Sequence, residues 1–164
     1  MVQAVMWIVI FGAVSLLFAA PMITTTKSPE TPLKPGHRDR CPVCGMFVMP
    51  YPEWIAQVRL RDGSTVFFDG CKDLFRYLLL NNRHRPEGSG KGVAAIFVTN
   101  YYDGETIAAR NAYFVVGSDV MGPMGPELVP HRSYGAAADF VKDHHGLAIL
   151  RFDDINEGVL RAID

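Results

Sequence analysis

The sequence predicts an α+β domain, preceded by an N-terminal membrane helix, in which two strand–strand–helix units supply antiparallel strands with the two helices on one side. Three observations carry this prediction. Short β-branched, aromatic or alternating runs occur in pairs. A stripe of apolar residues at helical spacing follows each pair. The order is then repeated, weakly, in the second half of the chain.

The chain begins with an apolar run over residues 4–23. Twenty residues rising about 1.5 Å each would cross a hydrocarbon layer of about 30 Å. A retained membrane anchor, a cleaved signal peptide and a buried core helix all remain open. No basic residue precedes the run and Phe18-Ala19-Ala20-Pro21 is a poor cleavage site, which favours the anchor. The Lys and Arg residues after the run would by themselves indicate a cytoplasmic domain.

A segment rich in proline and polar residues follows, with Pro29, Pro32 and Pro35. Such a composition does not bury a core and predicts a linker. We therefore expect an anchor or signal at 1–23, a linker at 24–40 and one folded domain at 41–164.

The first unit begins with a predicted hairpin. Alternating residues 54–60 are followed by an Asp62-Gly63 turn and by the β-branched and aromatic run 65–68. Asp69 is a candidate N-cap for the helix after it, in which Leu74, Phe75, Leu78 and Leu79 share one face. The apolar run 93–99 predicts a buried strand.

The second unit has the same order. Residues 112–116 predict a strand, residues 117–127 a loop and residues 128–132 a short returning strand. Ser133 is a candidate N-cap for a helix whose apolar stripe includes Phe140. Residues 147–152 predict the last strand.

Composition excludes some classes of function. The formal net charge is −1, so nothing attracts nucleic acid. The sequence contains no recognisable nucleophile–base pair or phosphate-binding glycine loop, and we expect no enzyme. The three cysteines are an odd number, which favours metal or redox chemistry over a disulfide framework.

The segment Cys41-Pro-Val-Cys44-Gly-Met46 carries the strongest local signal. Two thiols at this spacing can point at one centre, and Gly45 permits a tight turn between them. A zinc knuckle would need a second ligand pair, and a dithiol redox site usually opens a helix. Met46 adds a thioether, and thiolate with thioether favours Cu(I). A buried turn with merely packed cysteines is the structural alternative.

A second signal is Met121-Gly-Pro-Met124-Gly-Pro. Proline restricts its own φ and the residue before it, which stiffens this loop. Methionine usually fills gaps in a core, where it sits on a helix or strand. Its double occurrence here predicts two further sulfur ligands, Met124 more directly than Met121, against the alternative that both tuck onto the core. His131 is a weaker candidate for the same site.

At Cys44-Gly-Met46, at Phe67-Phe68-Asp69-Gly70 with the helix after it, and at the Met121–Met124 loop, the chain resembles the NosL family of copper-binding accessory proteins. The resemblance runs from about residue 41 to 154. It implies the paired units of the NosL and alkylmercury lyase group, an exported domain on the periplasmic face of a membrane, and Cu(I) as the bound metal. It implies delivery of copper to apo nitrous oxide reductase or another copper enzyme, and a membrane copper-delivery complex as a further partner.

Two departures from the family pattern bear on these expectations. Many members are lipoproteins, and this chain has no cysteine near residue 20 to accept a lipid, so its apolar run would replace that anchor. Cys41 makes a C-x-x-C motif that is not a general family feature. A thiol–disulfide redox protein that uses Cys41 and Cys44 therefore stays as the alternative function, with a zinc-stabilised interaction module behind it.

Overall fold

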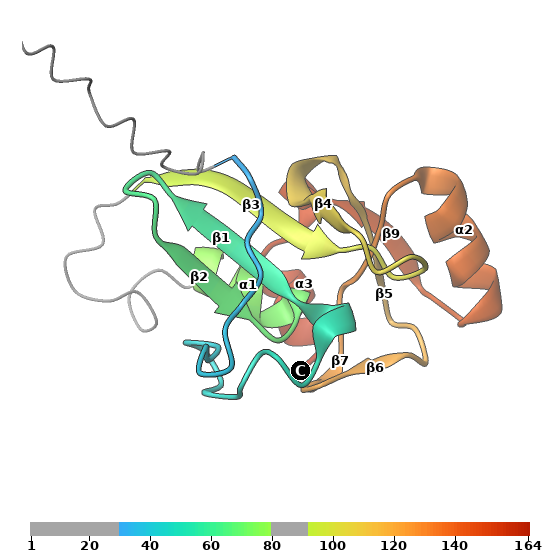
Figure 1. Ribbon diagram of the computed structural model, residues 1–164. Helices are drawn as coiled ribbons and strands as arrows, with labels where there is room; N and C mark the ends of the chain where they lie inside the picture. The colour runs from blue at the N-terminus through green and yellow to red at the C-terminus, as the bar shows by residue number, and fades with distance from the viewer. Residues whose placement is uncertain (1–29, 80–91) are drawn as a thin grey trace, which may run out of the picture.

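The computed structural model describes residues 30–79 and 92–164 (Figure 1). The expected anchor at 1–23 and the first part of the expected linker lie outside these residues. Among the residues that are described, none of the helices combines the length and the apolar character needed to cross a membrane.

The described chain alternates short strands with three α-helices and three 3-10 turns. The strands are β1 (Ala56–Leu60), β2 (Thr65–Phe68), β3 (Val93–Thr99), β4 (Thr106–Ala108), β5 (Tyr113–Val116), β6 (Met121–Gly122), β7 (Gly125–Pro126), β8 (Val129–His131) and β9 (Ala148–Arg151). The α-helices are α1 (Cys71–Leu79), α2 (Tyr134–Asp143) and α3 (Glu157–Ala162). The 3-10 turns are Pro52–Trp54, Ala109–Asn111 and Phe152–Asp154.

The strands form two larger antiparallel sheets, in the orders β2-β1-β3-β4 and β8-β5-β9. In each sheet the first strand of the unit lies in the centre, flanked by the strand before the helix and the strand after it. The fold is therefore mixed α+β with antiparallel sheets, as the sequence predicts. Figure 1 shows α1 packed behind the first sheet and α2 against the second.

The central strand β1 is buried on both faces. Ala56, Val58 and Leu60 point into the main core, whereas Gln57 and Arg59 point to the other face and are nevertheless buried. The chain before Cys41 runs across that face (Figure 1), where the Gln57 amide donates to the Leu33 carbonyl (2.9 Å) and accepts from the Leu33 N–H (2.8 Å). The described end of the expected linker therefore lies on the sheet.

One aromatic cluster joins the two units. The Phe75 ring of α1 packs edge-on against Phe114 of β5, with 5.3 Å between ring centroids, and 5.0 Å from Phe152. Helix α3 packs against α1 from the same side. The two units thus share a core, and α1 is held rigidly between them.

Three features differ from the sequence prediction. Strand β4 and helix α3 were not predicted. The predicted loop 117–127 contains a small hairpin of β6 and β7, which we call the methionine hairpin (residues 121–126). Its turn is Pro123-Met124, and Gly125 has a φ of +84°, a conformation that favours glycine. Proline and glycine therefore fold this stretch back on itself.

Candidate metal centre

The first part of the site is the turn that contains both neighbouring cysteines. The Cys41 N–H donates to the Met46 carbonyl, and the Gly45 N–H donates to the Cys41 carbonyl, each at 2.9 Å. Gly45 has a φ of +81°, which a residue with a side chain would rarely adopt. These two hydrogen bonds close the turn and turn both thiols toward the start of α1.

Two aspartates meet the thiols. The Cys41 thiol donates to Asp73 Oδ2 and the Cys44 thiol to Asp69 Oδ1, both at 3.2 Å. One ligand atom from each of these four residues lies within 4.8 Å of the other three. We call this group the Cys–Asp cluster. All three cysteines of the chain lie in the described part, and all are free.

The two carboxylates of the cluster differ in their surroundings. Asp73 is buried in the first turn of α1, and its Oδ1 accepts from Arg76 one turn further on (2.9 Å). Arg76 also pairs with Asp164 near the chain end. Its guanidinium therefore offsets part of the Asp73 charge. Asp69, at the end of β2, makes its hydrogen bonds to the cluster sulfurs, which leaves its charge more available to a cation.

Burial and the carboxylates keep protons on both thiols. Burial raises the pKa of Cys44 to about 12, and the hydrogen bonds to the aspartates add to that shift. Burial raises the pKa of Cys41 further still. At neutral pH the metal-free protein therefore has two protonated thiols that donate to carboxylates. A metal that binds sulfur here must displace a proton, because the thiolate is the ligand.

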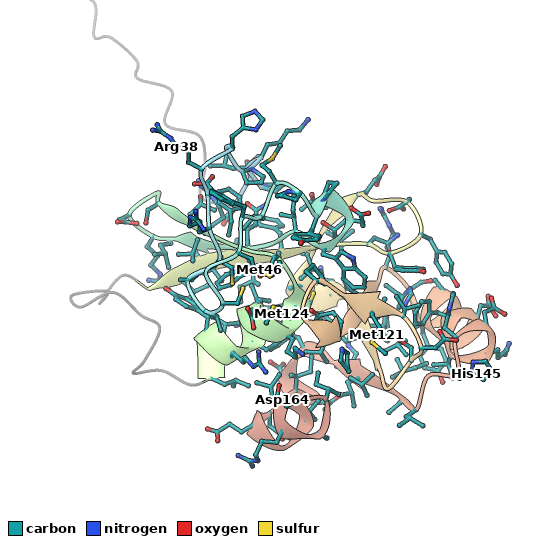
Figure 2. All side chains as sticks on the ribbon, turned by 90° about the horizontal axis from the view of Figure 1, so that it is seen from below. Arg38, Met46, Met121, Met124, His145 and Asp164 are labelled. Atoms are coloured by element: carbon teal, nitrogen blue, oxygen red, sulfur yellow. The ribbon has the colours of Figure 1, made fainter. Side chains whose placement is uncertain are left out.

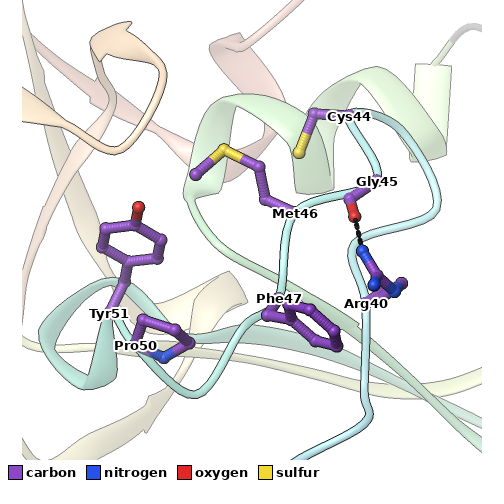
Figure 3. Close-up of a pocket in the computed structure, with 7 residues that line it drawn as sticks. All are labelled: Arg40, Cys44, Gly45, Met46, Phe47, Pro50 and Tyr51. Carbon is purple, nitrogen blue, oxygen red and sulfur yellow. Dashed lines mark hydrogen bonds between the residues drawn. The ribbon is translucent and has the colours of Figure 1, made fainter.

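The cluster opens to solvent on the side of Met46. A hollow of about 390 Å³ is lined by Arg40, Cys44, Gly45, Met46, Phe47, Pro50 and Tyr51. In Figure 3 the sulfur atoms of Cys44 and Met46 point into the same space, with the Tyr51 hydroxyl beyond them. Arg40 covers the Phe47 ring at 3.5 Å from its centroid. The structure thus brings Met46 to Cys44, as the sequence predicts.

The methionine hairpin presents its two sulfurs outward. Met121 is 57% exposed and Met124 43% exposed. In Figure 2, Met124 lies between Met46 and Met121. The Lys72 ammonium of α1 donates to the Met124 carbonyl at 3.0 Å, which ties the hairpin to the helix that carries Asp73. Met124 is therefore next to the start of α1, whereas Met121 lies further toward the second unit.

His131 has quite different surroundings. It is 0% exposed and packs against the rings of Tyr101, Tyr102 and Phe140, with centroids 4.6 to 6.0 Å away. Within the described chain neither of its ring nitrogens has a hydrogen-bond partner. Burial lowers its pKa to about 4, and the nearby His144 adds to this. It is not one of the four residues of the Cys–Asp cluster.

Sequence reasoning missed the roles of Asp69 and Asp73. Asp69 was expected to cap α1, but its carboxylate faces the sulfurs, and the side chain that accepts from the Lys72 N–H is Glu127. A signal was present, because residues four apart at a helix start lie on one face. Two aspartates at that spacing beside a C-x-x-C motif could have predicted the cluster.

Comparisons with known proteins show which proteins this chain is similar to. Residues 32–160 match the family model for NosL. The copper-binding lipoprotein NosL of Stutzerimonas stutzeri is 29% identical over 130 residues, which cover 75% of this chain and 65% of that protein. The protein of the same name from Achromobacter cycloclastes is 32% identical over 136 residues, covering 79% and 67%. The chain thus spans about two thirds of these relatives' length.

A solved structure shares the fold. The crystal structure of the copper chaperone NosL from Shewanella denitrificans matches with a TM-score of 0.67 and 25% sequence identity, over 80% of this chain and 99% of that one.

Proposed function

The chain belongs to the NosL family, and from that membership we propose that it is a Cu(I) carrier, not an enzyme, that delivers copper to an apo-enzyme outside the cytoplasm. The observation that carries this proposal is the Cys–Asp cluster, with two thiols and two carboxylates within 4.8 Å of one another, whose Cys44 lines an open hollow together with Met46. Its relatives are named copper-binding lipoproteins and a copper chaperone.

The proposed ligands are the thiolate of Cys44, assisted by Cys41, and the thioethers of Met46 and Met124. Thiolate and thioether are soft ligands that favour Cu(I) over harder ions. Met121 serves as a reserve ligand further along the hairpin. We leave His131 out of the ligand set, because its ring is enclosed by the aromatic side chains of Tyr101, Tyr102 and Phe140.

The Asp69 carboxylate contributes to copper binding in this proposal. Binding of Cu(I) at Cys44 removes the thiol proton, and Asp69 already accepts the hydrogen bond of that proton at 3.2 Å. Once that proton is gone, the Asp69 carboxylate charge would face the bound cation directly. Neutral thioethers then add affinity without further charge, which suits a cargo that has to be released.

Release to a client fits the position of the hollow. Phe47 and Met49, both exposed, lie on the chain segment that forms it, and the exposed methionines lie on the hairpin beyond. A client can therefore approach the sulfur side without opening the core. The client we propose is apo nitrous oxide reductase or another copper enzyme, with copper supplied by a membrane complex.

The proposed location rests on the apolar N-terminal run for the anchor and on the relatives named lipoproteins for the side of the membrane. We propose that residues 1–23 anchor the chain and that the domain starting near residue 41 faces the periplasm. Fractionation of cells with and without a carbonate wash tests this part. Recovery of the full-length protein from the soluble cytosolic fraction would contradict it.

A second candidate is a zinc-stabilised module, because two thiols and two carboxylates also suit Zn(II). Anaerobic loading of the protein with Cu(I) and Zn(II) together separates the two. The carrier proposal expects Cu(I) to be retained, at one per chain, after desalting. Retention of four-coordinate Zn(II) instead would contradict it. Turnover of a disulfide substrate without any need for the methionines would favour the redox alternative.

A further inference from the structure

Glu127 directly follows the methionine hairpin and is almost wholly buried, at 3% exposure. Its Oε1 accepts two backbone N–H groups. One is the adjacent Leu128 N–H, at 2.8 Å, and the other is the Lys72 N–H in the first turn of α1, 55 residues away in sequence. One carboxylate therefore joins the end of the hairpin to the start of the helix.

The helix start is a favourable place for this carboxylate. The first four N–H groups of an α-helix lack partners within the helix, so an acceptor oxygen is favoured there. Asp69, the side chain that local sequence would assign to this task, faces the cluster sulfurs instead. Glu127 satisfies the helix from a distant segment, and thereby links two parts of the proposed copper site.

Two glycines leave space for the Glu127 side chain. A Cβ at Gly70 would clash with Glu127 Oε2, and a Cβ at Gly122 would lie 3.1 Å from Glu127 Cγ. Gly70 belongs to the junction between β2 and α1, and Gly122 belongs to the hairpin. The β2–α1 junction and the hairpin therefore each have a glycine where a larger side chain would collide with Glu127.

Lys72 supplies a second tie. Its side chain is buried, and its ammonium donates to the Met124 carbonyl at 3.0 Å. This bond holds the turn of the hairpin, whereas Glu127 holds its far end. The hairpin is thus fixed at two points to the helix that begins beside the Cys–Asp cluster.

We propose that Glu127 and Lys72 are positioning residues that lock the methionine hairpin onto the start of α1, so that the Met124 thioether is held ready for copper at the Cys–Asp cluster. This inference rests on the proposed function. Neither side chain touches the metal. Residues that orient metal ligands typically change affinity by about 10–100-fold when they are removed.

The central test compares Glu127→Ala with Glu127→Gln in the full chain. The glutamine amide oxygen can accept both N–H bonds that Oε1 accepts, whereas alanine accepts neither. We expect Glu127→Ala to lower Cu(I) affinity about 10–100-fold in a chelator competition. X-ray absorption should show one sulfur fewer around copper in that variant. Glu127→Gln should restore both the affinity and the sulfur count.

A second variant, Lys72→Leu, keeps the backbone N–H bond to Glu127 and removes the ammonium, with its bond to the Met124 carbonyl and its charge near Glu127. It should lower affinity less than Glu127→Ala does, and it carries the test if Glu127→Ala fails to fold. Ile149→Val, which alters the other core cluster, is a matched control for lost stability and should leave Cu(I) affinity unchanged.

A metal-free readout separates this inference from the proposed function. In the apo-protein with ¹³C-methyl methionine, the Met124 methyl should become more mobile in Glu127→Ala and Lys72→Leu, and should remain as in wild type in Glu127→Gln and Ile149→Val. Wild-type affinity and methyl dynamics in folded Glu127→Ala and Lys72→Leu would overturn the positioning role. Failure of the wild-type protein to bind Cu(I) would instead overturn the proposed function.

Discussion

The two strand-to-helix junctions of the molecule occupy the same place in their units but are used differently. Between β8 and α2, Ser133 caps its own helix by accepting from the Ala136 N–H at 3.2 Å, and the junction is exposed. Between β2 and α1, Asp69 turns away from its helix toward the Cys44 thiol, and the junction is buried. The β2–α1 junction, in the first unit, carries the proposed site. The β8–α2 junction, in the second unit, only caps its helix. We call them the first and the second junction.

The difference shows how a chain can free a carboxylate for chemistry. An N-cap side chain normally uses its oxygen to satisfy the first turn of its own helix. In the first unit, Glu127 accepts from the Lys72 N–H, so Asp69 can face sulfur without leaving that N–H group unpaired. Within residues 30–79 and 92–164, no distant side chain accepts from the start of α2, and Ser133 caps that helix itself.

The largest effect should come from the thiols of the first junction. We expect Cys44→Ser to lower Cu(I) affinity more than about 100-fold, beyond what removal of a supporting residue costs, and Cys41→Ser to lower it less. Cys44 faces the hollow, whereas Cys41 lies beneath it. Competition with a colorimetric chelator under anaerobic conditions measures both.

Cys71→Ala is the matched control, because this third thiol is buried and lies outside the Cys–Asp cluster. It should bind Cu(I) like wild type. If Cys41→Ser and Cys44→Ser also bound like wild type, the thiols would be structural and the two junctions would not differ in function.

The next effect concerns the second unit and pH. Burial lowers the pKa of His131 in the folded protein to about 4, below the ordinary value of 6.5. Between pH 4 and pH 6.5 the ring is therefore neutral in the folded protein and takes up a proton when the protein unfolds. Its contribution to stability is complete above pH 6.5 and is lost as pH falls toward 4. Between pH 7.5 and 4.5 wild type should lose about 2–3 kcal/mol more unfolding free energy than His131→Phe.

Urea unfolding at the two pH values measures this difference, in which the carboxylates common to both proteins cancel. His144, the other titratable ring near His131, is present in both. Equal pH dependence in the two proteins would show that the buried His131 ring is not held neutral.

The smallest effect should come from the ordinary cap. Ser133→Ala should lower the unfolding free energy by about 1 kcal/mol and leave Cu(I) affinity unchanged, because the second junction only caps a helix. Thermal or urea unfolding and the chelator competition measure the two quantities on the same sample. A marked loss of copper affinity in Ser133→Ala would break the division between the two junctions.

Much of the fold could be predicted from local patterns. The alternation over residues 54–60 and the β-branched run after Asp62-Gly63 correspond to β1 and β2, and Ser133 caps α2 as predicted. Strand β4 and helix α3 were missed. Both are short, and both are ordered by what they pack against: β4 pairs with β3, and α3 packs on α1.

The sequence predicts only part of the candidate site, because the rest depends on contacts between distant segments. The sulfur residues are visible in sequence because their chemistry is unusual, and Met46 lies beside Cys44 as expected. The role of Asp69 was not visible, since its competing task as a cap is removed only by Glu127 from a distant segment. His131 lies close enough to Met124 in the sequence to be a candidate ligand. In the structure its ring packs against Tyr101 and Phe140, which come from other parts of the chain.

The central claim is that the methionine hairpin and the first junction form one copper site. X-ray absorption at the copper edge of the Cu(I)-loaded protein, wild type against Met124→Leu, tests it most directly, because leucine keeps the volume and removes only the sulfur. The account predicts one sulfur fewer around copper and a lower affinity in the variant, with Met121→Leu affected less. An unchanged sulfur count and unchanged affinity in Met124→Leu would contradict it and would place copper at the cysteines and Met46 without the hairpin.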